Sequence, residues 1–526
     1  MKSVLLVLLC ALAISPLLSI RESLWIDELH SAWTISGEWS EIEPRAASGN
    51  QSPLYFYGLR AFSTAFRAFE QTGVGNEAIL RASSLIGWWM LCGFSLLTIH
   101  RRNPIDGKWV TMMVIALWLW IDRIGAFYAI ELRPYIWVAV LSLFVMQSGA
   151  KLAEQPNRLG IAWLIASSLV FYLHYTSLIV IGLSWLAIVA AIAWRWTSIE
   201  SPHRRPIVGW RLVEIALLSL LCAPGLLQLN GSYRNVQQWS SFAGDGSLVK
   251  LVDILPWCFW MLIPTVAYTT QKWLRERPSH GRTLRSAKVP MAIATESGNA
   301  TDPSAWLLQL FAVGFGTVLI AWLFTYLNIA PLMHRRYVIG SYPAILLAGA
   351  FCLGGIRNSK SVLLVGLVSA GLLAYWQGTT SEWYAGRWIA WQRQEDWRGA
   401  AVVLSDLRKP KEPIFLAPML IETTEANVHN TKYSSYFKFA LASLYRVSEA
   451  DSIQILSNSR IRWKTDFLEY CRANSHDVGW IVARVDASAL DGIDAGMQSK
   501  DAVEIGWKFE RVFNGGRVQV LKVEKR

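Results

Sequence analysis

The sequence contains little cysteine and little charge for its length. Only six cysteines occur in 526 residues, and charged residues make up 17% of the chain. Five cysteines fall in or beside apolar segments and the sixth, Cys471, lies in the polar C-terminal part. This placement provides no disulfide framework, and the sequence has no CxxC pair that could form a metal site. The C-terminal part also lacks a GxGxxG or Walker-type loop, so nothing there predicts dinucleotide or ATP binding.

Hydrophobic residues, in contrast, are abundant. They make up 53% of the chain, which includes 28 tryptophans and has a mean hydropathy of +0.30. This exceeds what a soluble domain needs for its core, and it predicts a polytopic membrane protein. The net charge of +12 comes mostly from lysines and arginines in short segments between apolar runs. Such a distribution sets the orientation of a membrane protein, and it argues against nucleic-acid binding.

About eleven segments are apolar and long enough to be candidate spans. Each approaches the roughly 20 residues that a spanning helix needs. They lie near residues 3–20, 80–99, 109–128, 134–150, 159–174, 176–194, 211–228, 252–270, 306–328, 338–356 and 361–376. The segment 53–69 is apolar but carries Arg60 and Arg67, so it is predicted to be a helix at the membrane interface.

The basic residues predict the orientation, because cytoplasmic connections carry an excess of lysine and arginine. Alternate connections have this excess: they are centred on Arg101–Lys108, Lys151–Arg158, Arg195–Arg211, Lys272–Lys288 and Arg357–Lys360. With Lys2 inside, the loop 21–79 and everything after residue 376 face outward across the cytoplasmic membrane. The loop 271–305, rich in Arg, Ser, Gly and Pro, is expected to be a disordered cytoplasmic connection.

The first apolar segment has an alternative interpretation as a cleaved signal peptide, since it follows Lys2 and is short. No A-x-A site precedes the polar run, and cleavage would leave the following loop without its membrane tether. We therefore expect residues 1–376 to form one transmembrane domain.

Residues 377–526 have a different composition. Apolar runs shorten to strand length at Pro413–Ala417, Gly479–Ala483 and Arg517–Leu521, and helix-like stretches lie at Trp397–Leu404 and Tyr436–Tyr445. This alternation predicts a soluble, extracytoplasmic α/β domain.

Two adjacent carboxylates, Asp27 and Glu28, follow the first apolar segment by seven residues. An acidic pair close to the bilayer anchors a membrane helix poorly, and it suits general-base chemistry at the membrane surface.

Three arginines also break the charge pattern, because they lie at the outer ends of predicted spans. Arg133 occupies a very short turn, and Arg335 and Arg336 stand between two other spans. The planar guanidinium group can hold a lipid phosphate at fixed geometry. The alternative is a snorkelling arginine that only fixes a helix end.

Further candidates are histidines and aromatic residues on the same side. His174 and His334 could each hydrogen-bond a phosphate or a sugar hydroxyl, although a lone interfacial histidine is more often structural. Trp25 could stack on a sugar, although most tryptophans and tyrosines here are expected to form interface belts. Tyr55 and Tyr135 are further possible contacts to the sugar or the acceptor.

Together these segments resemble the GT-C glycosyltransferases of the protein O-mannosyltransferase and lipid A aminoarabinose transferase type (family 39, ArnT-like). The resemblance covers nearly the whole membrane part. It is carried, in order, by Trp25–Glu28 after the first span, Ser52-Pro-Leu-Tyr55, Arg133-Pro-Tyr135, His174-Tyr175, Arg335-Arg-Tyr337 and Glu395-Asp-Trp-Arg398. Ser52 stands where the family usually has proline.

The resemblance implies an inverting transfer of a sugar from a polyprenyl-phosphate carrier to an extracytoplasmic protein, lipid or glycan acceptor. It implies that Asp27 is the base, that Glu28 helps to position the acceptor or the base, and that Arg133 and Arg336, assisted by Arg335 or His174, hold the carrier phosphate. No metal or other cofactor is expected, and the sequence has no DxD loop to supply ligands.

Two other functions remain open from the sequence. A transporter or lipid flippase would also combine many spans with an external domain, but it would place polar residues and broken helices near the bilayer midplane. A non-catalytic assembly or anchoring subunit would leave Asp27, Arg133 and Arg336 unexplained.

Overall fold

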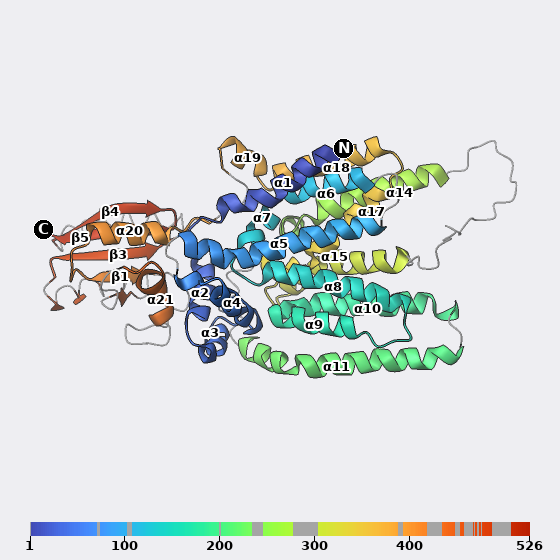
Figure 1. The fold of residues 1–526 in the computed structure, drawn as a ribbon, viewed down its shortest axis with the longest axis horizontal. Helices are drawn as coiled ribbons and strands as arrows, with labels where there is room; N and C mark the ends of the chain where they lie inside the picture. The colour runs from blue at the N-terminus through green and yellow to red at the C-terminus, as the bar shows by residue number, and fades with distance from the viewer. Residues whose placement is uncertain are drawn as a thin grey trace.

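The computed structural model describes residues 2–70, 74–102, 108–198, 201–233, 246–276, 303–387, 393–417, 434–447, 453–456, 467, 469–470, 473–474, 476–485 and 506–526. In these ranges a bundle of long apolar helices precedes a five-stranded sheet (Figure 1). The prediction of a polytopic α-helical membrane protein with a C-terminal α/β domain is confirmed.

Eight helical segments in the described ranges are long and apolar enough to cross a membrane. In a bilayer the backbone must satisfy its own hydrogen bonds, so apolar runs of this length form helices. The segments contain α1 (Lys2–Ser19), α5 (Val74–Arg102), α8 (Tyr135–Glu154), α10 (Leu178–Trp194), α11 (Ser201–Tyr233), α15 (Pro303–Tyr326), α16 (Arg335–Val338) with α17 (Tyr342–Gly354), and α18 (Ser359–Trp376).

The bent pair α6 (Lys108–Ile121) and α7 (Arg123–Ile130) would make nine spans, fewer than the eleven predicted. Segment 159–174 contains only the 13-residue α9 (Ile161–Leu173), whose length of about 20 Å is short for a bilayer. Segment 252–270 is interrupted at Pro256, between α13 (Leu248–Asp253) and a π-helical turn (Cys258–Leu262) that leads into α14 (Ile263–Glu276). The rest of the predicted cytoplasmic loop, residues 277–302, lies outside the described residues.

The predicted span 109–128 is broken at Asp122, where the axes of α6 and α7 differ by 69°. Asp122 is the N-cap of α7 and accepts hydrogen bonds from the backbone N–H groups of Ile124 (3.3 Å) and Gly125 (2.7 Å). It also accepts from Tyr342 Oη (2.8 Å) and Gln377 Nε2 (2.6 Å). A buried carboxylate with four donors therefore stabilises the break.

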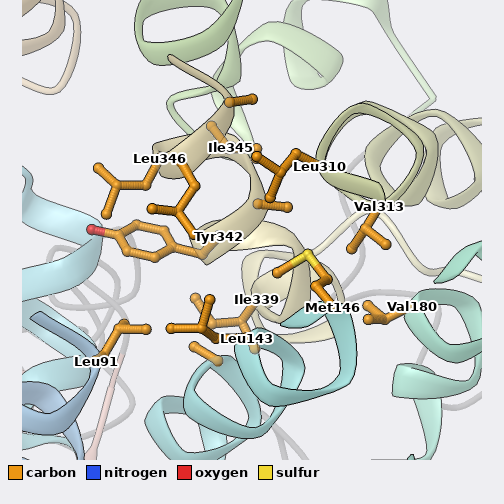
Figure 2. Packing of buried hydrophobic residues seen from close by; sticks show 14 of the residues in the cluster. Leu91, Leu143, Met146, Val180, Leu310, Val313, Ile339, Tyr342, Ile345 and Leu346 are labelled. Carbon is orange, nitrogen blue, oxygen red and sulfur yellow. The ribbon is translucent and has the colours of Figure 1, made fainter. Parts of the chain in front are cut away.

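The core of the bundle is continuous across helices that are distant in sequence. Figure 2 shows side chains of α5, α8, α10, α15 and α17 in contact, among them Leu91, Met146 and Ile345. Gly349 on α17 lies against the π-helical turn, where an added Cβ would be only 1.6 Å from the carbonyl oxygen of Trp260. Close packing of these two segments therefore requires glycine at this position.

Three helices of the loop 21–79 lie between the bundle and the sheet (Figure 1). They are α2 (Ile26–Ser36), α3 (Ile42–Ser48) and α4 (Leu54–Ala65), and α4 coincides with the predicted interfacial helix. Their apolar side chains share one buried cluster with residues of the C-terminal domain, including Leu29, Phe56, Trp397 and Leu441. The loop and the C-terminal domain are thus packed as one core.

The C-terminal sheet has strand order β2-β1-β3-β5-β4, with β1, β2 and β3 parallel and β5 antiparallel to both neighbours. Three strands lie where the sequence predicts them, and β2 and β4 were not predicted. The helices α20 and α21 also match the predicted stretches. The elements are α19 (Thr379–Tyr384), α20 (Trp397–Leu407), β1 (Ile414–Ala417), α21 (Ser434–Phe439) with a π-helical turn (Ala440–Leu444), β2 (Gln454–Ile455), β3 (Val478–Arg484), β4 (Trp507–Gly515) and β5 (Val518–Lys525).

Candidate active site

The acidic pair opens helix α2. Trp25 is the N-cap, and Asp27 and Glu28 are the second and third residues of the helix. Acidic side chains are favoured there because the first backbone N–H groups lack helical partners and the helix dipole is positive at this end. Glu28 Oε2 accepts a hydrogen bond from Trp25 N at 3.3 Å, which completes a capping box.

Glu28 is fully buried and bound on both oxygens. Its Oε1 accepts from Arg81 Nε and from the backbone N–H of Leu132, each at 3.0 Å. Its Oε2 accepts from Arg81 Nη2 at 2.5 Å and from Arg393 Nε at 3.1 Å. Burial alone would raise the pKa of Glu28, but the two guanidinium groups and the hydrogen bonds outweigh it and lower the pKa. Glu28 is therefore a buried ionic junction between α2, α5 and the turn after α7.

Asp27 has different surroundings. Its Oδ1 lies 3.5 Å from Arg133 Nη2 and its Oδ2 lies 3.8 Å from Arg336 Nη1, and its side chain is 28% exposed. These are ion-pair distances rather than hydrogen-bond distances. Burial acts to raise the pKa of Asp27, but Arg133 and Arg336 together bring it below the ordinary value, so the group is a carboxylate at neutral pH.

Arg133 lies in the turn between α7 and α8, followed by Pro134 as the N-cap of α8. The turn is held by hydrogen bonds from Arg133 N to Glu131 O (2.7 Å) and from Ser84 Oγ to the same oxygen (2.5 Å). The Arg133 side chain is only 6% exposed. Its Nε and Nη1 are buried and have no hydrogen-bond partner in the described part of the chain. Buried donors of this kind are suited to an anionic ligand.

The side chains of Arg335 and Arg336 bind different partners although the two residues are adjacent in sequence. Arg336 donates from Nη2 to Tyr337 Oη at 3.1 Å, and its guanidinium carbon lies 4.9 Å from the centre of the Tyr337 ring. Its Nε is buried without a hydrogen-bond partner among the described residues. Arg335 is 41% exposed and pairs with Asp253 at 3.8 Å. The structure therefore brings Arg336, but not Arg335, to Asp27.

Both candidate histidines lie near Arg336. His334 is the N-cap of α16, and its Nδ1 accepts from Arg336 N at 3.3 Å. His174 Nδ1 is 2.7 Å from Thr176 Oγ1, and its ring lies 5.8 Å from that of Tyr337. Burial, reinforced by Arg336, lowers the pKa of His174 to about 3 and that of His334 to about 4. Both rings are therefore neutral hydrogen-bonding groups.

The aromatic candidates surround the same cluster. Tyr135 follows Arg133 by two residues, and its ring centre lies 5.5 Å from that of His174. Tyr55 is buried on α4. Trp25 forms a T-shaped contact with Phe127, with ring centres 6.0 Å apart.

Three residues of the site were not predicted from the sequence: Arg81, Arg393 and Glu131. Arg81 lies at the outer end of a predicted span, so the charge rule that identified Arg133 would also have identified it. Arg393 reaches the site from the start of the C-terminal domain, which no local pattern shows. Glu131 is buried with Oε2 unpaired within the described ranges, and burial, only partly offset by Arg393 and Arg133, raises the pKa of Glu131 to about 8.

No group of three or more His, Cys, Asp and Glu side chains that could hold a metal ion occurs among the described residues. The cluster thus consists of one partly exposed carboxylate, two arginines with unused donors, neutral histidines and tyrosines. Such a set can bind a phosphate and accept a proton from a neighbouring hydroxyl group.

No protein-family model matches the sequence, and no curated protein matches it. Among solved structures, the chain is similar to the crystal structure of ArnT from Cupriavidus metallidurans in the apo state. The TM-score is 0.41 and the identity 12%, over 99% of this chain and 97% of that chain.

Proposed function

We propose that the protein is an integral-membrane glycosyltransferase that moves a sugar from a polyprenyl-phosphate carrier to an extracytoplasmic acceptor, with inversion. The observation that supports this most is the convergence of three distant segments: Asp27 Oδ1 is 3.5 Å from Arg133 and Oδ2 is 3.8 Å from Arg336. A base next to cationic donors suits a reaction in which a hydroxyl loses its proton while a phosphate gains charge.

In this mechanism, Asp27 takes the proton of the acceptor hydroxyl. The acceptor oxygen forms a bond to the anomeric carbon as the bond from that carbon to the phosphate oxygen breaks, and the electron pair stays on the phosphate. Attack opposite the departing phosphate inverts the anomeric centre, so one base is enough. Among the described residues, the carboxylate oxygens of Asp27 have ion-pair contacts to Arg133 and Arg336 but accept no hydrogen bond, so both can accept one from an incoming hydroxyl.

The arginines would bind the phosphate and stabilise it as it leaves. Arg133 and Arg336 have unused N–H donors, and both side chains are largely buried, so their field is weakly screened. The same groups lower the pKa of Asp27. A bound phosphate would offset their charge, so we expect carrier binding to make Asp27 a stronger base.

The remaining candidates would shape the site around these groups. His174 and His334 would orient Arg336 and Tyr337, and Trp25, Tyr55 and Tyr135 would contact the sugar or the acceptor. We infer that the reaction takes place at the external face of the cytoplasmic membrane and that neither a metal nor another cofactor takes part. The acceptor class, whether protein, lipid or glycan, remains open.

The transporter or flippase alternative predicts broken helices with polar residues, and α6 and α7 form such a pair. However, the oxygens of Asp122 at this break already accept from Tyr342, Gln377 and two backbone N–H groups. Asp122 is therefore engaged in capping the helix rather than free to bind an ion. The unused donors lie instead at the turn of Arg133, which favours the transferase.

The test is transfer from a panel of radiolabelled polyprenyl-phosphate sugars by the purified protein in membranes. Asp27→Asn should reduce transfer by about 10³-fold while carrier binding persists, because an amide cannot take the proton. Arg336→Ala should mainly weaken carrier binding. Asp406→Asn, on an exposed part of α20, serves as the matched control. Full activity of the Asp27→Asn protein would reject the proposed base.

A further inference from the structure

The segment 393–398, which leads into the C-terminal domain, contacts the start of α2 and the chain just before it. Arg393 and Glu395 make these contacts through their side chains, and Arg398 through its backbone N–H, which donates to Ser23 Oγ. None of them touches Asp27, yet each binds the chain within a few residues of it.

Glu395 binds the first residue of α2 directly. Its Oε2 accepts a hydrogen bond from Ile26 N at 2.9 Å, and also one from Trp397 Nε1 at 3.1 Å. Its Oε1 accepts from Arg484 Nε on β3 at 2.7 Å. Glu395 is buried, so this charged hydrogen bond to an otherwise free helix N–H is protected from water. The sheet therefore holds the residue that immediately precedes Asp27.

Arg393 acts on the residue that immediately follows Asp27. It donates from Nε to Glu28 Oε2 at 3.1 Å and from Nη2 to Phe127 O at 3.3 Å, and it lies over the Phe127 ring at 4.7 Å. Its side chain is buried. Because Glu28 also accepts from the backbone N–H of Leu132, Arg393 supports the junction that ties α2 to the turn of Arg133.

Arg398 fixes the chain just before α2. Its backbone N–H donates to Ser23 Oγ at 3.2 Å, and its guanidinium group pairs with Glu77 on α5. Glu77 also accepts from Tyr445 Oη, which belongs to the C-terminal domain, at 2.5 Å. Together with the shared apolar core, these bonds fix the C-terminal domain to both ends of the loop 21–79.

We propose that Arg393 and Glu395 are positioning residues, through which the C-terminal domain sets the first turn of α2 so that Asp27 faces Arg133 and Arg336. This rests on the proposed function, in which Asp27 is the base. It assigns to the C-terminal domain a part in building the catalytic geometry. A displacement of a reacting group by about 1 Å can cost about 100-fold in rate.

The experiment compares Glu395→Ala and Glu395→Gln in the full-length protein in lipid nanodiscs. Hydrogen–deuterium exchange is measured for the backbone of residues 26–36, and kcat and KM for the carrier are measured per folded protein. Glu395→Ala should accelerate exchange in the first turn of α2 and lower kcat at least tenfold, with KM changed less than threefold. Glu395→Gln keeps an oxygen that can accept from Ile26 N, so it should recover part of both effects.

Glu510→Gln is the matched control, because Glu510 is exposed on β4, where it pairs with Lys508 and lies opposite Lys522. Arg393→Lys is a second variant that keeps the charge but loses the planar group, and it should also lower kcat more than it changes KM. Exchange that is unchanged at residues 26–29 in Glu395→Ala and Arg393→Lys would overturn the proposal. Faster exchange with unchanged kcat would overturn it as well.

The two proposals fail differently. Absence of transfer by the wild-type protein counts against the proposed function. The exchange measurement requires no activity, so it decides whether the C-terminal domain holds the first turn of α2 even in that case.

Discussion

The first turn of α2 carries two adjacent carboxylates, and these differ in burial and in hydrogen bonding. On one side Glu28 is fully buried and accepts five hydrogen bonds, from Arg81, Arg393 and two backbone N–H groups. On the other side Asp27 is 28% exposed and only pairs with Arg133 and Arg336 at 3.5 and 3.8 Å. Chemically similar groups one residue apart are thus placed in opposite environments.

In the proposed function, this difference assigns a structural role to Glu28 and a reactive role to Asp27. A buried carboxylate with all its acceptor positions occupied stabilises the fold and has no oxygen free for a substrate. A partly exposed carboxylate beside arginines with unused donors contributes less to stability and remains available for proton transfer. Substitutions at the two carboxylates and at their arginine partners test whether the two roles differ in this way.

The largest effect is expected from Glu28→Gln. This substitution leaves the buried guanidinium groups of Arg81 and Arg393 without their shared anion, so the free energy of unfolding should fall by about 3–5 kcal/mol. Asp27→Asn should change the free energy of unfolding by less than about 1 kcal/mol while it reduces transfer by about 10³-fold. Thermal unfolding of both variants in the same detergent measures the contrast. Equal thermal midpoints for the two proteins would contradict it.

Arg133→Lys should lower kcat/KM by about 100-fold, because lysine keeps the charge but not the planar set of donors that grips a phosphate. Transfer kinetics at saturating acceptor measure this effect. Arg67→Lys is the control, because Arg67 is 75% exposed and forms an exposed pair with Glu70. Unimpaired kinetics of Arg133→Lys would mean that no phosphate is bound by the guanidinium group.

Glu131 should make stability depend on pH. Burial raises its pKa to about 8 from an ordinary 4.5, so the folded state binds a proton that the unfolded state releases between these values. The contribution of this proton to the free energy of unfolding is fully present below about pH 4.5. It falls by about 1.4 kcal/mol per pH unit as the pH rises to about 8. Glu131→Gln should remove this dependence, which unfolding midpoints measured from pH 5 to 8 can show. An identical pH profile in both proteins would refute the assignment.

The smallest effect is expected from Arg335→Gln, because Arg335 is half-exposed and pairs with Asp253 rather than Asp27. An exposed ion pair contributes at most about 1 kcal/mol, so transfer should fall less than about fivefold. Arg336→Gln should reduce carrier affinity much more. Binding of labelled carrier to both variants compares the neighbours directly, and equal losses would place Arg335 in the site.

Much of the fold could be predicted from composition and periodicity. Long apolar runs identify helices because the bilayer leaves few alternatives, and the short alternating runs after residue 412 identify three strands. The breaks at Asp122 and Pro256 were missed because a single capping residue or proline interrupts an otherwise continuous apolar segment. Strand β4, with exposed Lys508 and Glu510, lacks the apolar run by which the others were predicted.

The candidate site was predictable in part for a related reason. Asp27, Arg133 and Arg336 stand out because charges at the outer ends of spans are rare and need an explanation. The functions of Glu28, Arg393 and Glu395 depend on pairings over about a hundred residues or more, such as Glu28 with Leu132 and Ile26 with Glu395. Sequence spacing alone cannot show which of two adjacent carboxylates turns toward such a partner.

The break at Asp122 has a consequence for the spacing of the two arginines. Asp122 precedes α7, which ends at the turn of Arg133, and it accepts a hydrogen bond from Tyr342, six residues after Arg336. One carboxylate inside the bundle thus joins the two segments that present the guanidinium groups. In the proposed function, the half of the cluster that binds the anion is thus braced from inside the bundle through Asp122 and Tyr342, whereas the half that accepts the proton is also held by the sheet through Glu395 and Arg484.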